Sequence, residues 1–223
     1  MTRLTRTLIA TTVLTILPLS LAYAAGSTDP AITGQGTSTI LNGQVDFHVA
    51  NSTLNVDTSN VSGNVAQQSV AGGNAVDITT MNNTEVTNNQ YVSSVNISSN
   101  MNANVNNTGG TVSLTSQAIC NSAGVSMDPT STNVYSNQEC NAVDPSSTLN
   151  ASVTNAGNDV SLASAAIGNS FEEDTNAKYG AVQNYQINNS NVNSAVNGSV
   201  TNVTGNVTAT SAAIGNTAQI VHY

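Results

Sequence analysis

The sequence predicts an all-β fold: a repeat β-solenoid of four units, each about 47 residues long, after an N-terminal signal peptide. Three observations carry this prediction. A short phrase recurs at a nearly constant period, apolar and polar residues alternate between its copies, and a Gly- or Asn-bearing turn lies at the same place in each unit. The signal peptide is expected at residues 1–24 and the β-solenoid repeat domain at residues 25–223.

The recurring phrase begins with a serine, continues with small and aliphatic residues, and ends with an asparagine. Successive serines are separated by 47, 48 and 47 residues. A period of this length indicates a stacked array rather than a globular core around one active site. The four copies are Ser69–Asn74, Ser116–Asn121, Ser164–Asn169 and Ser211–Asn216.

Each unit reads in the same order: a glutamine, an alternating strand, a Gly-bearing turn, a second strand that begins with valine, the phrase itself as a turn, and a variable loop. Amides that stack one strand spacing apart hydrogen-bond along a column. The predicted turn and ladder residues are Asn74, Asn121, Asn169 and Asn216, with Gln44, Gln90, Gln138 and Gln186. A unit could form two short rungs or one wide rung. The variable segments 123–133 and 170–178 are expected to bulge from one edge.

The composition favours a thin core. Charged residues make up 7% of the chain and aromatic residues 4%, and tryptophan is absent. Because aromatic side chains bury the largest apolar areas in ordinary cores, stacked columns of Val, Ile and Ala are the expected alternative. Disorder is the other option for so polar a chain, but a disordered tract has no reason to keep Val and Gly in register.

The first residues are typical of an export signal. Arg3 and Arg6 precede an apolar run from Leu8 to Leu21, and residues 22–24 (Ala-Tyr-Ala) form a cleavage site with small residues. The run is too short for a membrane span, and no later segment is apolar enough for a helical one. Cleavage would leave Lys178 as the only basic residue. This excludes nucleic acid and anionic membrane surfaces as partners.

Two cysteines, Cys120 and Cys140, lie in this exported chain. If adjacent rungs stack, the two thiols could face each other and form a disulfide, which would stabilise the fold by roughly 3 kcal/mol. Two buried free thiols are the alternative.

No catalytic or metal-binding constellation stands out, and we predict a non-enzymatic protein without a cofactor. His48 and His222 share no metal-like spacing with each other or with the cysteines. The acidic cluster at residues 172–174 could hold Ca²⁺, but a solvated loop beside Lys178 is the favoured interpretation. The remaining carboxylates are scattered over turns, which argues against a sugar-cleaving β-helix enzyme.

The Ser-x-Ala-Ile-Gly-Asn phrase, the Asn/Val/Ser/Thr strands, the glutamine at each unit start and the export signal resemble bacterial holdfast-anchor proteins. The resemblance extends over the mature chain. It implies a cell-surface protein that ties an adhesive polysaccharide to the outer membrane. Curlin-type amyloid subunits are similar in style, with repeats about half as long. The phrase also resembles the head repeats of trimeric adhesins, which recur at shorter intervals.

The resulting hypothesis is a secreted structural protein, at the cell surface or associated with the outer membrane. It would self-associate, or stack with related surface fibre subunits, as an adhesin, an anchor or an amyloid-like fibre subunit in attachment or biofilm formation. The alternative is an exported β-solenoid module that binds extracellular polysaccharide.

Overall fold

The computed structural model describes residues 38–80, 84–93, 96–127, 131–141, 144–176 and 179–222. In this part of the chain each sequence unit forms one wide coil of three strands, rather than two short rungs. We number the coils 1 to 4. Their strands are β1 (Ser38–Asp46), β2 (Ala50–Val61) and β3 (Val65–Thr80); β4 (Thr84–Val92), β5 (Ile97–Thr108) and β6 (Val112–Met127); β7 (Ser131–Cys140), β8 (Ser146–Ala156) and β9 (Val160–Thr175); β10 (Tyr179–Asn188), β11 (Asn193–Val203) and β12 (Val207–His222).

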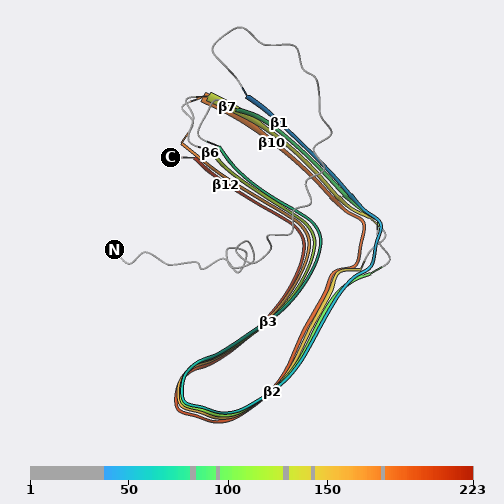
Figure 1. Cartoon of the computed structure of the whole chain (residues 1–223). Coiled ribbons are helices and arrows are strands. Elements are labelled where there is room, and N and C mark those ends of the chain that lie inside the picture. Colours follow the sequence, from blue (N-terminus) through green and yellow to red (C-terminus); the bar gives the residue numbers. More distant parts are fainter. Residues whose placement is uncertain are drawn as a thin grey trace.

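Equivalent strands of successive coils pair in parallel and build three four-stranded sheets. Their orders are β1-β4-β7-β10, β2-β5-β8-β11 and β3-β6-β9-β12. Figure 1 looks along the stack, so the coils overlie one another as a single bent outline. The predicted all-β solenoid of four units is therefore confirmed. The register also places the ladder residues opposite one another, as with Gln44, Gln90 and Gln138.

Alternation explains why these segments are strands. In β5, the side chains of Ile97, Met101 and Val105 are fully buried, whereas Asn102 and Asn104, which point to the opposite face, are exposed. Because successive side chains of a strand point to opposite faces, one face of each sheet lines the interior and the other faces solvent.

The Gly-bearing turns form the corner between the second and third strand of each coil, as predicted. Just before each corner an asparagine adopts a left-handed conformation, with φ between 54° and 58°, which asparagine tolerates better than most residues. Corners of adjacent coils lie in direct contact. A Cβ atom added at Gly109 would lie 2.7 Å from the carbonyl oxygen of Ser62 in coil 1, so a side chain there would require the backbone to shift.

The core is a thin layer between facing sheets, divided into three clusters. The first, including Met101 and Leu149, lies between the second-strand sheet and the N-terminal part of the third strands. The last, including Val134 and Phe171, lies between the first-strand sheet and the end of the third strands. Between them a small cluster surrounds Cys120 and Cys140. This matches a composition poor in aromatic residues.

Two expectations about the third strand are wrong. The Ser-to-Asn phrase is not a turn but lies inside the 16-residue strands β3, β6, β9 and β12. The segments expected to bulge continue as strand to Met127 and Thr175 and pair in register, while residues 128–130 and 177–178 lie outside the described residues. The glycine of the phrase marks a close approach instead. A Cβ at Gly73 would lie 2.8 Å from the Cγ2 of Val92, on the strand that faces it.

The predicted signal peptide lies outside the described residues and stays a prediction. Within the described ranges, no helix has the length and apolarity needed to cross a membrane.

Candidate functional site: amide ladders and open coil ends

A continuous glutamine ladder runs through the interior of the first-strand sheet. The Nε2 atom of each glutamine donates to the Oε1 atom of the glutamine one coil earlier, over 2.8 Å from Gln90, 2.8 Å from Gln138 and 2.7 Å from Gln186. Each Nε2 atom also donates to a backbone carbonyl across the core, as Gln90 does to Ser122 at 2.9 Å. The ladder therefore binds neighbouring coils together and also links the two facing sheets.

The phrase asparagines form a second interior ladder with the opposite direction. The Nδ2 atom of Asn74 donates to the Oδ1 atom of Asn121 at 3.0 Å, and the same bond repeats from Asn121 to Asn169 and from Asn169 to Asn216, at 2.8 Å each. Their Nδ2 atoms also donate to carbonyls of the facing strands, such as that of Glu139 at 3.0 Å. Asn121 and Asn169 are fully buried, so these bonds satisfy amides that water cannot reach.

A serine spine, absent from the sequence-based prediction, connects the second and third strands. Hydroxyl groups from alternating sheets hydrogen-bond in one chain, with oxygen–oxygen distances between 2.8 and 3.1 Å. The signal was available, because a serine in the second strand recurs at the same period as the phrase serine. The spine consists of Ser52, Ser69, Ser99, Ser116, Ser147, Ser164, Ser194 and Ser211.

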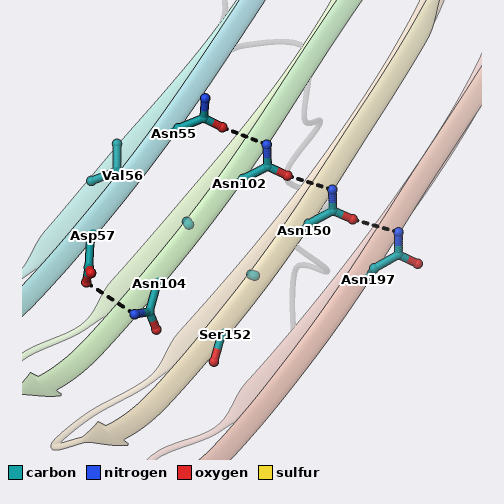
Figure 2. Close-up of a pocket in the computed structure, with 10 residues that line it drawn as sticks. Asn55, Val56, Asp57, Asn102, Asn104, Asn150, Ser152 and Asn197 are labelled. Carbon is teal, nitrogen blue, oxygen red and sulfur yellow. Dashed lines mark hydrogen bonds between the residues drawn. The ribbon is translucent and has the colours of Figure 1, made fainter.

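The outer face of the second-strand sheet carries further ladders. Asn55, Asn102, Asn150 and Asn197 hydrogen-bond in a row at 2.7 to 2.9 Å, as Figure 2 shows. A shallow, open trough runs beside this row, bordered on its other side by Asp57, Asn104 and Ser152. A parallel ladder joins the left-handed asparagines at the corners, from Asn60 to Asn202. These exposed amides keep donor and acceptor capacity toward solvent.

The outer face of the first-strand sheet differs in chemistry. Among the aromatic side chains that the structure describes, all except the buried Phe171 lie on or beside this face. Tyr135 and Tyr185 are 43% and 56% exposed, and Phe47 contacts Tyr91 edge to face with ring centroids 6.1 Å apart. Amides such as those of Asn89 and Asn137 lie between the rings. We call this surface the aromatic face.

The disulfide between Cys120 and Cys140 is confirmed. It joins β6 of coil 2 to the end of β7 in coil 3, across Cα atoms 5.9 Å apart. It closes a loop with a sequence separation of 20, which corresponds to roughly 3 kcal/mol of stabilisation in the chain-entropy model. In the other coils the Cys120 position is occupied by glycine, so coil 2 replaces the small residue by a covalent link to coil 3.

The acidic cluster is not a solvated loop, since residues 172–174 lie inside β9. Glu173 points into the core, is fully buried, and neither carboxylate oxygen has a hydrogen-bond partner. Burial, and secondarily the charge of Asp174, raise its pKa to about 7. Its column otherwise holds Ile78, Val125 and Ile220, so the carboxyl group occupies an aliphatic position.

The described residues contain no group of three His, Cys, Asp or Glu side chains placed to hold a metal ion. His48 is exposed, with its Nδ1 atom 3.6 Å from the Oδ1 atom of Asp46, and His222 lies at the end of β12.

The ends of the stack differ from its middle. The outer edges of β1, β2 and β3 at one end, and of β10, β11 and β12 at the other, face no further strand within the described part of the chain. An unpaired edge of this kind exposes backbone N–H and C=O groups that can pair with another strand.

Comparison with known proteins gives one result. The family model described as HfaD, holdfast attachment protein D, matches residues 18–223, which is nearly the whole chain. No curated protein and no solved structure matches the chain significantly. The extent of the match and the repeat architecture agree with the resemblance drawn from the sequence. The chain therefore belongs to the HfaD family of holdfast attachment proteins, with a role in surface attachment and a place among exported or cell-surface proteins.

Proposed function

We propose that this protein serves attachment as a self-associating structural element, whose copies add end to end into a continuous β-stack at the cell surface. The observation that carries the proposal is the unfinished state of coils 1 and 4. Leu54 and Val196 are only partly buried, although the residues of the same column in coils 2 and 3 are completely buried. A further coil on either end would complete the core and pair the backbone edges.

Little in the described surface opposes such addition. Natural edge strands are commonly protected by lysines, bulges or a covering element. The described residues include no lysine or arginine, and the third strands are 16 residues long with continuous register between coils. A stack of this kind has a cross-β repeat along its axis, the geometry of an amyloid-like fibre.

The test uses purified protein spanning the predicted mature chain, residues 25–223. Sedimentation and negative-stain microscopy over a concentration series should give rods that lengthen with concentration and persist in mild detergent. Fibre diffraction of aligned rods should give a reflection near 4.7 Å along the axis. A species that stays monomeric at every concentration contradicts self-association.

A second candidate function, binding of an extracellular polysaccharide, is favoured by the aromatic face. Flat aromatic rings with interspersed amides suit a neutral sugar chain, since rings cover the C–H faces of sugars and amides hydrogen-bond their hydroxyls. The described part of the chain carries no lysine or arginine to attract an acidic polymer. Tyr135 and Tyr185, in register-adjacent columns of β7 and β10, are the central rings.

A glycan array probed with monomeric protein tests this candidate. The double variant Tyr135→Ala/Tyr185→Ala should lose at least ten-fold in affinity for the best neutral glycan. Asn197→Ala, on the outer face of a different sheet, is the matched control and should bind as wild type does. Equal binding by the tyrosine variant and the wild type would remove the aromatic face from consideration.

A further inference from the structure

The direction of each interior amide ladder is fixed by bonds outside the ladder. The Nε2 atoms of Gln44 and Gln186 donate to the carbonyl oxygens of Ala75 and Thr217, both at 3.0 Å. The Nδ2 atom of Asn74 likewise donates to the carbonyl of Tyr91 at 2.9 Å. A carbonyl accepts and cannot donate, so turning any of these amides over would set oxygen against oxygen. The two interior ladders therefore have defined and opposite polarities.

These polarities make the two ends of the stack chemically complementary. At the coil 1 end, Gln44 presents an N–H group along its column and Asn74 presents its Oδ1 atom. At the coil 4 end, Gln186 presents its Oε1 atom and Asn216 presents an N–H group. In both interior ladders, the amide donor at one end of the stack thus corresponds to an amide acceptor at the other.

The exposed ladders repeat the same relation. Asn102 donates to Asn55 and Asn197 donates to Asn150, so the coil 1 end has a donor and the coil 4 end an acceptor in this column. The corner ladder has the same direction, with Asn107 donating to Asn60 and Asn202 donating to Asn155. Four independent columns agree.

The outline of the coil selects the same orientation. Figure 1 shows a bent outline whose two arms differ, one closed at the corner between β2 and β3 and the other holding β1 and the ends of the third strands. A copy turned over, to pair coil 1 with coil 1, presents the mirror image of this outline and places donor beside donor. A copy moved along the axis keeps every column aligned and every strand parallel.

We infer that copies stack head to tail, with coil 4 of one copy against coil 1 of the next, Gln44 donating to Gln186 and Asn216 donating to Asn74. The inference rests on the proposed self-association and gives it a direction and a register. β10, β11 and β12 pair with β1, β2 and β3 of the following copy. An interface between two different surfaces gives an open filament when each copy is displaced along the axis from the one before, as coil stacking requires.

End-blocked variants test the direction. Gln44→Lys/Leu54→Lys places two charges in the interior columns of coil 1, and Gln186→Lys/Val196→Lys does the same in coil 4. In a monomer these terminal side chains reach water at the open end, but an added copy would bury the charges. The matched control, Thr53→Lys/Ser199→Lys, adds as many lysines to outward-facing, exposed positions of the same coils.

Head-to-tail stacking predicts that each end-blocked variant stays monomeric alone and that an equimolar mixture gives a heterodimer of twice the monomer mass and nothing larger. The control variant should form filaments as wild type does. If either blocked variant dimerises alone, the stacking is head to head or tail to tail and the inference is overturned, although self-association survives. If both form filaments alone, the coil ends are not the interface. If wild type never assembles, the proposed function itself fails.

Cross-linking gives a second readout that leaves the interior unchanged. Asn55→Cys and Asn197→Cys introduce single exposed thiols in one outer column, at opposite ends of the stack. With a short bismaleimide, a mixture of the two variants should cross-link into dimers, and either variant alone should give at least ten-fold less. Cross-linking of Asn55→Cys alone, at the level of the mixture, contradicts the head-to-tail direction.

Discussion

Coils 2 and 3 compared with coils 1 and 4 show what one repeat achieves with and without neighbours. The residues and the register are nearly the same, yet Met101 and Leu149 are completely buried while Leu54 and Val196, in the same column, are partly exposed. The apolar side chains of one coil are covered above and below by those of its neighbours, so the core is complete only where coils lie on both sides.

The polar columns show the same contrast. Gln138 has both an amide above and an amide below and is fully buried, whereas Gln44 and Gln186 each have a neighbour on one side only. The ends thus have unfilled hydrogen-bonding capacity as well as unfinished apolar packing. The repeat that makes the middle stable makes the ends suited to assembly.

Truncation of an inner core residue should have the largest effect. Leu149→Ala removes a fully buried side chain from coil 3 and should lower the free energy of unfolding by roughly 2–5 kcal/mol. Leu54→Ala, in the same column of coil 1, should cost clearly less in the monomer because that site is already open to water. Urea unfolding of the two variants under non-assembling conditions measures the difference. Equal losses would show that the end coil is as well packed as the middle.

The buried Glu173 should make the inner stack sensitive to pH. Its carboxyl group titrates at about 7 in the folded chain against an ordinary pKa of 4.5, so the folded state holds a proton that the unfolded chain has released. Stability should therefore fall as pH rises from 4.5 through 7. Above pH 7 the penalty reaches roughly 3 kcal/mol.

Glu173→Val installs the residue found in the same column of coil 2. It should stabilise the protein by about that amount at pH 8 and change little at pH 4, as followed by urea unfolding at both values. The control is Glu172→Val, on the opposite face of the same strand, which keeps Glu173 and should therefore retain the fall in stability of wild type between pH 4.5 and 7. If the free energies of unfolding of Glu173→Val and wild type differed by the same amount at both pH values, the carboxyl group would have to lie in water.

The sequence was sufficient for the fold because a fixed period determines which residues lie above one another. Val65, Val112 and Val160 recur in step and pair in the third-strand sheet, and Gln44, Gln90 and Gln138 do the same in the first-strand sheet. The number of rungs per unit could not be predicted from the sequence, because alternation of apolar and polar residues identifies strands but does not show where a coil turns. The phrase glycine was read as a turn for the same reason. Its role in a close approach depends on Val92, which lies on β4, the first strand of the next coil.

The candidate site was predictable in part. The ladder amides were visible as recurring residues, but their opposite directions depend on carbonyls of facing strands, which only the coil geometry places. The acidic cluster was predicted wrongly, because three consecutive acidic residues are typical of a solvated loop. Aligning the units would have placed Glu173 in the column of Val125 and Ile220 and indicated its burial. The aromatic face arises from residues at unequal positions in different units and has no periodic signal.

The phrase asparagines provide the finest comparison of middle and end. Asn121→Ala removes a fully buried amide that bonds to both neighbouring asparagines and to the carbonyl of Glu139, and it should cost roughly 1–3 kcal/mol in the monomer. Asn216→Ala, exposed in coil 4, should cost under about 1 kcal/mol there, because water replaces the hydrogen bonds that the side chain loses.

In the assembled state we expect Asn216→Ala to have the larger effect of the two. Asn216 would then be an interior donor, so its loss should raise the concentration needed for filament formation several-fold, while Asn121→Ala should leave that concentration nearly unchanged once the monomer is folded. Measuring unfolding and the critical concentration on the same two variants separates the stability of the coil from the bonding capacity of its end. If Asn216→Ala left the critical concentration unchanged, the terminal asparagine would take no part in joining copies.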